Sequence, residues 1–280
     1  MGSVDLHVHS TASDGELPPV EVVERASSAG VTVLSITDHD TISGVPTAAE
    51  AGGELGVRVV SGCEFSVRAG WGELHLLAYF LPLDSADLEF FLSDQRQKRE
   101  RRAEEIVRCL RDAGVTVSLE DVRRHAQGGV FGRPHVARAL VELGVVADVQ
   151  EAFDRYLGAG RRCCVPKVLP TVEEVVQLVR ASGGVTSAAH LKHRATRNAV
   201  DELKTSGVDA LEAIHPSHDE STGRRIRNLA GAAGLLLSGG TDWHGDDHVA
   251  AGRGQLGSAA VPIEWFEELE ALSGSRTFGR

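Results

Sequence analysis

The stretch VDLHVHSTASDG, residues 4–15, joins an apolar strand to a loop rich in side chains that can bind metal. Alternate residues of a strand point to the same side, so His7 and His9 can present two imidazoles to one ion. This strand is the first of about seven, and most of the others are separated by helices. Alternating strands and helices predict an α/β fold with a largely parallel sheet, which is either a closed barrel or an open doubly wound sheet.

Imidazoles and carboxylates recur near the ends of the predicted strands. These strands are expected at residues 4–8, 31–36, 57–61, 74–80, 185–189, 210–214 and 235–238. The side chains that can bind metal at or near their ends are His7, His9, Asp38, His39, Glu64, His75, His190, His215, Asp242 and His244. Barrel enzymes build their sites at the carboxyl ends of the strands. Ionisable groups that converge there need cations or hydrogen bonds to offset their desolvation, which predicts a metal site.

A helical segment interrupts the alternation between about Asp84 and Pro166. Outside it, helices are expected at residues 18–29, 45–55, 171–180, 198–206, 222–233 and 263–272. Inside it, we expect helices at residues 88–112, 119–126, 134–143 and 149–157. The prediction is a discontinuous barrel domain, residues 1–84 and 166–280, with a helical insertion domain, residues 85–165. The many charges of the insertion are interpreted mostly as a solvated helix face with pairs spaced four residues apart.

Composition indicates a globular protein and argues against several functions. Of the 280 residues, 42% are hydrophobic and 25% are charged, and the net charge of −11 argues against binding long duplex nucleic acid over the whole surface. GxxxxGK[ST] does not occur, and the GxGxxG match at residues 252–257 neither directly follows a predicted strand nor opens a predicted helix, which disfavours nucleotide binding of the Rossmann or P-loop type. No apolar run is long enough for a bilayer and no signal peptide is recognised. The four cysteines are expected to be free thiols in a cytoplasmic protein without an obligate protein partner.

Six motifs resemble those of the PHP (polymerase and histidinol phosphatase) superfamily. They are HVHSTASDG (7–15), TDHD (37–40), GCEFS (62–66), LHLLAY (74–79), AAH (188–190) and GTDWHG (240–245). A further segment, FGRPHVARAL (131–140), is similar to a stand-alone bacterial subgroup with a helical insert, which includes nucleoside 3′,5′-bisphosphate phosphatases and 5′–3′ exoribonucleases. The resemblance implies a distorted (β/α)7 barrel with two or three divalent ions, which are manganese, iron or zinc.

The resemblance also implies which residues hold these ions. The first ion would be bound by His7, His9, Glu64 and Asp242, the second by Asp14, His39 and His244, and the third by His75, His190 and a bridging Glu64. Asp14 stands where many members of the superfamily have histidine. A carboxylate is a harder ligand than imidazole, so this substitution favours manganese or iron over zinc.

The expected activity is hydrolysis of terminal phosphate esters by hydroxide formed on the metal ions, on nucleoside 3′,5′-bisphosphates, nucleoside monophosphates or short oligonucleotide 5′ ends. The candidates for binding the phosphate are Arg133, His135, Lys167, Arg194 and His215. Arg133 and His215 are the expected catalytic residues, with His215 as proton donor or phosphate ligand. Arg133 directly precedes a helix that begins with proline, and a helix N-terminus attracts anions. Its alternative role is a salt bridge between insertion and barrel.

Three other functions stay open from the sequence. They are a histidinol-phosphate phosphatase, a non-catalytic PHP binding module and a metal-dependent amidohydrolase on the same barrel. The helical insertion and its GRPH segment, residues 132–135, argue against the first. The complete set of metal ligands argues against the second. His125, His218 and His248 are expected at the surface.

Overall fold

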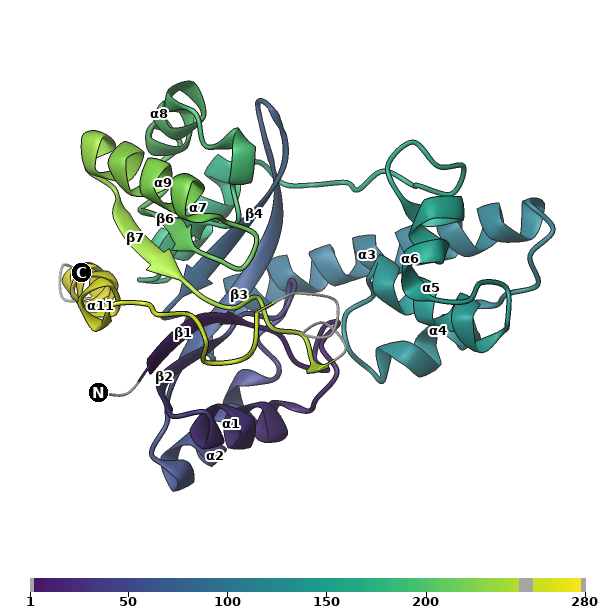
Figure 1. Cartoon of the computed structure of the whole chain (residues 1–280), viewed down its shortest axis with the longest axis horizontal. Coiled ribbons are helices and arrows are strands. Elements are labelled where there is room, and N and C mark those ends of the chain that lie inside the picture. Colours follow the sequence, from purple (N-terminus) through teal and green to yellow (C-terminus); the bar gives the residue numbers. More distant parts are fainter. Residues whose placement is uncertain (1–2, 247–253, 278–280) are drawn as a thin grey trace.

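Seven strands form one sheet in the order in which they occur in the sequence. The computed structural model describes residues 3–246 and 254–277. The strands are β1 (Ser3–Val8), β2 (Val31–Ile36), β3 (Arg58–Ala69), β4 (Gly72–Tyr79), β5 (Val185–Ala188), β6 (Ala210–Ile214) and β7 (Leu236–Gly239). A parallel bridge between Val8 and Trp243 brings the chain that follows β7 back against β1 (Figure 1). The predicted α/β architecture is confirmed.

The hairpin of β3 and β4 departs from the prediction. We expected the third strand over residues 57–61 with Glu64 just after it, but β3 continues to Ala69 and turns through Gly70 and Trp71 into β4. β4 is antiparallel to both β3 and β5, whereas the other four strand pairs are parallel. A short turn can join antiparallel strands, and Gly72, with φ of +126°, supplies a backbone conformation that other residues rarely adopt. Glu64 therefore lies inside a strand.

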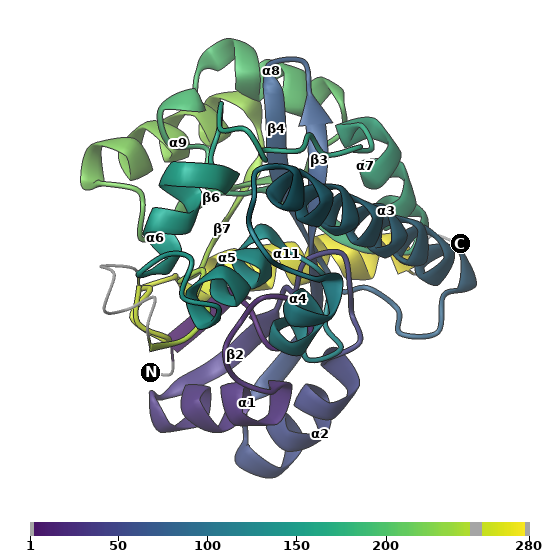
Figure 2. The same ribbon diagram turned by 90° about the vertical axis from the view of Figure 1, so that its right-hand side faces the viewer.

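The helices around the sheet leave one of its ends to the inserted segment. α1 (Pro19–Ser28) and α2 (Val45–Leu55) pack beside β1 and β2, while α7 (Val172–Ala181), α8 (Arg197–Thr205) and α9 (Glu220–Ala233) lie beside β5 to β7 (Figure 1). α11 (Ile263–Thr277) lies at the amino ends of the parallel strands, where Phe266 and Leu269 share a buried cluster with Val4 and Leu6. The opposite end of the sheet faces the inserted helices (Figure 2).

The inserted segment contains α3 (Ala86–Asp112), α4 (Leu119–Ala126), α5 (Arg133–Glu142), α6 (Val149–Ala152) and η1 (Phe153–Leu157), a π-helix. Buried side chains between Ile106 and Cys163 form a hydrophobic cluster of their own. Leu88 and Leu92, near the start of α3, belong instead to the cluster under β3 and β4. Because α3 contributes to both cores, it holds the other inserted helices in place over the strand ends. The division into two domains stays a prediction.

The prediction of four free thiols is wrong for one pair. Cys109 of α3 and Cys163 form a disulfide, with their Cα atoms 5.5 Å apart, whereas Cys63 and Cys164 are free. Disulfide connectivity depends on which elements pack together, so the spacing of these cysteines could not reveal it. The bond ties the end of the inserted segment to α3.

None of the helices in the described part of the chain combines the length and the apolar character needed to cross a lipid bilayer.

Candidate active site

Glu64 is the centre of the cluster at the strand ends. This carboxylate is 1% exposed, and its two oxygens contact five imidazoles, those of His7, His9, His39, His75 and His190. Oε1 lies 2.8 Å from Nδ1 of His75 and 3.1 Å from Nε2 of His190. Oε2 lies 3.0 Å from Nδ1 of His39 and 3.2 Å from Nε2 of His9. One carboxylate thus touches histidines from both sides of the cluster, as a bridging ligand would.

Asp242 and Asp14 supply the other carboxylates of the cluster. Oδ1 of Asp242 lies 3.3 Å from Nε2 of both His7 and His9. Oδ1 of Asp14 lies 3.4 Å from Nε2 of His244, whose ring stacks on that of His9 with centroids 4.0 Å apart. The structure therefore brings together all nine residues that the sequence analysis assigned to metal.

The backbone at several of these positions adopts conformations that are uncommon for residues with a side chain. φ is +33° at His190 and +50° at Asp242, both in or near the left-handed region. Such outliers cost free energy and cluster at functional sites, where the surrounding structure holds them. Here they follow β5 and β7 and turn the two side chains towards Glu64 and His7.

A buried carboxylate that does not belong to the cluster holds the loop after β1. Asp38 accepts hydrogen bonds from the backbone N–H of Ser10 at 2.8 Å and from the hydroxyls of Ser10 and Ser13, both at 2.6 Å. These bonds fix the loop that connects His9 to Asp14. Asp38 stood out in the sequence as part of TDHD, and its role is to position that loop.

The donor set fits divalent cations. Nε2 of His7, Nε2 of His9 and Nδ1 of His39 are buried and make no hydrogen bond, which is costly for imidazole nitrogens unless another partner binds them. Four groups of ligand atoms, each within 4.8 Å of one another, are present among the described residues, and together they include eight of the nine predicted ligands. The ninth, His190, contacts Glu64 directly. Nitrogen and carboxylate ligands in such groups suit manganese, iron or zinc.

The protonation of the cluster is coupled to metal binding. Burial opposes the charge on Glu64, but the neighbouring His75, His39 and His7 outweigh burial and hold the pKa of Glu64 well below its usual range. Burial lowers the pKa of His39 well below its ordinary value, so its ring is neutral. Metal ligands must be deprotonated carboxylates and neutral imidazoles, and Glu64 and His39 meet these conditions. Burial opposes the charge on His7, His9 and His75, but the neighbouring carboxylates outweigh burial and raise the pKa of all three rings, so a metal ion would displace protons from them.

A cavity of about 310 Å³ opens above this cluster. We call the nine predicted metal ligands the floor; seven of them line the cavity, Asp14, His39, Glu64, His75, His190, Asp242 and His244. We call four basic residues that line the same cavity the cationic wall; they are Arg99, Arg102, Arg133 and Lys167, on or next to the inserted helices. Phe153 of the π-helix also lines the cavity, as do His215 and Lys192. π-helical turns are frequently found at functional sites.

The four cations of the wall differ in their partners. Arg99 is paired with Asp40, with Nε 2.6 Å from Oδ2, and Lys167 is paired with Glu73. Arg102 donates to the carbonyl of Val165 at 2.8 Å, and Arg133 donates to the carbonyl of Leu157 at 3.2 Å. In the part of the chain that the structure describes, neither Arg102 nor Arg133 has a carboxylate partner.

Arg102 and Arg133 lie close enough for their positive charges to repel each other. Burial, together with the charges of Arg133 and Arg99, lowers the pKa of Arg102 to about 10. Arg102 still carries its charge at pH 7, so two uncompensated guanidinium groups face the cavity. An anion bound between them would relieve this repulsion and accept several charge-assisted hydrogen bonds.

His215 is placed to donate a hydrogen bond into the cavity. Its Nδ1 accepts the backbone N–H of Ser217 at 3.0 Å, and its Nε2 lies 3.2 Å from Oδ2 of Asp242. Because Nδ1 accepts a hydrogen bond, the neutral ring carries its proton on Nε2. The ligand atoms of His215 lie within 4.8 Å of those of His7 and Asp242, but a protonated Nε2 donates hydrogen bonds and does not bind metal.

The other predicted substrate contacts are placed unevenly. Lys167, like Arg133, lines the cavity. Arg194 lies over the ring of Trp71, 5.1 Å from its centroid, and His135 is buried at the start of α5, where its Nδ1 accepts the N–H of Gly132. Neither of these two lines the cavity, so their placement gives no support to a role in binding substrate, and that role stays a prediction.

The histidines expected at the surface make ordinary contacts. His125 pairs with Glu142, and His218 lies half-buried beside His215. His248 lies outside the described residues.

Several residues of the cavity were missed in the sequence. Arg99 and Arg102 were assigned to a solvated helix face, and Lys192 and Phe153 were not considered. Spacing alone could not distinguish Arg99 and Arg102 from the other basic residues of the same helix. Glu212 was also missed, although a charged residue inside the apolar strand ALEAI, residues 210–214, is a signal that the sequence does contain.

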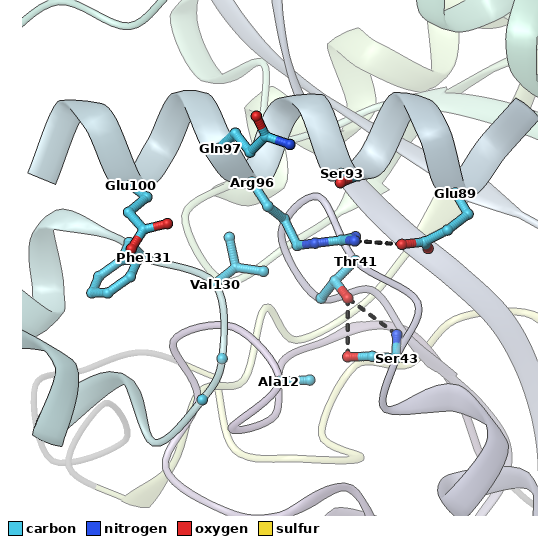
Figure 3. Close-up of a pocket in the computed structure, with 12 residues that line it drawn as sticks. Ala12, Thr41, Ser43, Glu89, Ser93, Arg96, Gln97, Glu100, Val130 and Phe131 are labelled. Atoms are coloured by element: carbon cyan, nitrogen blue, oxygen red, sulfur yellow. Dashed lines mark hydrogen bonds and ion pairs between the residues drawn. The ribbon is translucent and has the colours of Figure 1, made fainter.

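A second cavity, of about 400 Å³, lies on another face of α3. Figure 3 shows Arg96 pointing into it from α3 and paired with Glu89, and Thr41 bonded to Ser43 across from the helix. Glu100 also lines it. Its arginine is neutralised and two carboxylates surround it, so this cavity does not offer the anion site that the first one does.

Comparison with known proteins gives consistent matches. The PHP domain family matches residues 5–142. The 5′–3′ exoribonuclease of Haemophilus influenzae is 34% identical over 245 residues, which cover 86% of this chain and 89% of the relative. The 3′,5′-nucleoside bisphosphate phosphatase of Chromobacterium violaceum is 31% identical over 252 residues, which cover 87% of this chain and 88% of the relative.

A solved structure agrees over nearly the whole chain. A metal-dependent phosphoesterase from Bifidobacterium adolescentis superimposes with a TM-score of 0.87 at 27% sequence identity, covering 97% of this chain and 96% of the other. The fold, with its inserted helices, is therefore shared along the full length.

Proposed function

We propose that this chain, which belongs to the PHP domain family and is a metal-dependent phosphoesterase, removes terminal phosphates from small nucleotides. Its substrates would be nucleoside 3′,5′-bisphosphates, nucleoside monophosphates or short oligonucleotide 5′ ends. The relatives named above as an exoribonuclease and as a bisphosphate phosphatase support both forms of substrate.

The proposed choice of substrate rests on one observation. Arg102 and Arg133 lack a carboxylate partner among the described residues and face the floor across the cavity. A substrate with one phosphate at the floor and a second phosphate at these guanidinium groups would satisfy both sides. Nucleoside bisphosphates and the first nucleotide of an RNA chain both carry two phosphates separated by a ribose.

The nine residues assigned to metal would hold two or three ions, with manganese as the proposed metal because three of the nine are carboxylates. Such ions neutralise phosphoryl oxygens and lower the pKa of a bound water molecule. The Nε2–H group of His215 would donate a hydrogen bond to a phosphoryl oxygen. Arg133 and Arg102 would hold the second phosphate and orient the nucleotide.

We further propose that residues 85–165 form a helical domain that reads the substrate. Its support is the separate hydrophobic cluster between Ile106 and Cys163, which holds the helices that carry Arg133 and Phe153. A cytoplasmic location stays a prediction from the sequence.

A substrate panel tests the proposal. Manganese-loaded protein is assayed with adenosine 3′,5′-bisphosphate, adenosine 5′-monophosphate, a short 5′-phosphorylated RNA and histidinol phosphate. We expect kcat/KM to be highest for the bisphosphate or the RNA, and lower for the monophosphate, which lacks the second phosphate. Highest activity on histidinol phosphate would overturn the substrate assignment. Absence of hydrolysis for all four by metal-loaded protein would favour a binding module.

A further inference from the structure

Glu212 is a buried carboxylate that lies behind the floor and does not line the cavity. It lies in β6 between apolar neighbours and is 0% exposed. A charged group in such a place is costly unless other groups satisfy it by hydrogen bonding. The hydrogen-bond partners of Glu212 therefore indicate its role.

Both oxygens of Glu212 are engaged by N–H groups of predicted metal ligands. Oε1 lies 2.8 Å from Nδ1 of His7, and Oε2 accepts the backbone N–H of His190 at 2.6 Å. An ionised carboxylate only accepts hydrogen bonds, so His7 must carry its proton on Nδ1. The Nε2 of His7 is then the nitrogen that is left to bind a metal ion, and it is one of the buried nitrogens without a hydrogen-bond partner.

The second bond acts on the backbone. His190 has φ of +33°, a conformation that residues with a side chain seldom adopt. The bond to Glu212 helps to fix this turn, and the turn places Nε2 of His190 3.1 Å from Oε1 of Glu64. His7 and His190 belong to different predicted metal sites, so a single carboxylate supports both.

We propose that Glu212 is a positioning residue that sets the tautomer of His7 and the backbone turn at His190, and so prepares two metal sites at once. It touches neither the cavity nor the groups that would react. The inference rests on the metal ligands of the proposed function and is independent of the choice of substrate.

The test compares Glu212→Gln with the wild type in manganese binding, measured by calorimetric titration of metal-free protein. Glutamine has nearly the same shape, but it has one acceptor oxygen and so cannot accept from both N–H groups. Loss of such an outer partner typically weakens metal binding 10–100-fold, and we expect an effect of that size here. Glu212→Ala should weaken binding at least as much.

Two controls separate the possible failures. Asp209→Asn alters a carboxylate that precedes the same strand and pairs with Arg276, remote from the floor, and should bind manganese like the wild type. Nitrogen chemical shifts of the histidine rings in metal-free protein should show His7 protonated on Nδ1 in the wild type and a changed ring signal in Glu212→Gln. This readout does not depend on metal or substrate.

The outcomes are distinct. Unchanged manganese affinity and an unchanged His7 signal in a folded Glu212→Gln variant would refute the positioning role while leaving the proposed function intact. A wild type that binds no divalent metal would overturn the proposed function, and the ring signals would then decide the tautomer claim alone. If Glu212→Gln fails to fold, as judged by circular dichroism, the wild-type ring signal still decides it, because a His7 ring without a proton on Nδ1 contradicts the inference.

Discussion

The floor and the cationic wall face one another across a single cavity, but their charged groups are satisfied in different ways. In the floor, Glu64 and Asp242 each contact several imidazoles within the chain. In the wall, Arg102 and Arg133 contact only carbonyl oxygens and a thiol among polar partners in the described residues. Divalent cations would complete the converging imidazoles and carboxylates of the floor, whereas an anion would complete the two guanidinium groups of the wall that have no carboxylate partner among the described residues.

The difference indicates separate roles for the two regions. The floor is buried at the strand ends and should support catalysis. The wall lies on or next to the inserted segment and should determine which phosphate compound binds. Predictions for the floor therefore concern turnover, and predictions for the wall concern selectivity and stability.

The largest effect is expected in the floor, from His9→Ala. Nε2 of His9 lies between the carboxylates of Glu64 and Asp242, so its loss should remove a ligand of the first ion. Metal ions contribute several kcal/mol of transition-state stabilisation, so we expect kcat/KM to fall by about a thousandfold or more. His7→Ala and Asp242→Ala should behave alike.

Phosphatase assays alongside circular dichroism check this prediction. His125→Ala is the matched control, because His125 pairs with Glu142 far from the floor and should keep full activity. Normal turnover in any folded variant of the three ligands would show that its assignment is wrong.

The next largest effect concerns the stability of the inserted segment, which carries most of the wall. Replacing Cys109 and Cys163 with serine removes a link between residues 54 positions apart in the sequence. A disulfide typically stabilises by about 2–4 kcal/mol, so the free energy of unfolding should fall by that amount while metal content is unchanged. Urea denaturation measures the loss, and a dithiol reductant should reproduce it in the wild type. Equal stability of the oxidised and reduced proteins would contradict the prediction.

A smaller effect is expected from Arg133→Ala, and it should be selective. Hydrogen bonds to charged groups contribute about 1.5–3 kcal/mol, so kcat/KM for a bisphosphate should fall roughly ten- to a hundredfold, mainly through KM. The loss for a monophosphate should be smaller. Arg133→Lys keeps the positive charge and should recover some of the activity. The recovery should be incomplete, because an ammonium group lacks the planar fork. Equal losses for both substrates would make Arg133 a general phosphate anchor and remove its role in selectivity.

The smallest effect is expected in the second cavity, from Arg96→Ala. Arg96 lies on the same helix as Arg102 but is already paired with Glu89. Exposed ion pairs contribute about 0.2–1 kcal/mol to stability, and we expect kcat/KM to change less than about twofold. A loss as large as that of Arg133→Ala would show that the two cavities are not functionally distinct.

The sequence was sufficient for the α/β class, the positions of the inserted helices along the chain and the convergence of the predicted metal ligands at the strand ends. His7, His9, His39 and Asp242 lie within a few residues of strands whose apolar pattern is strong. The carboxyl ends of parallel strands meet at one end of a sheet, so local pattern was enough to place these side chains together.

Tertiary structure alone decided the antiparallel hairpin of β3 and β4, because strand direction depends on which strands pair. It also decided the disulfide between Cys109 and Cys163, since spacing does not determine connectivity. Above all, tertiary structure determined which basic residues form the wall. Arg99 and Arg102 have the same local sequence character as their exposed neighbours, and only the packing of α3 against the strand ends turns them towards the cavity. Periodicity identifies the faces of a helix, but contacts distant in sequence determine which face is buried and which charges are left without a partner.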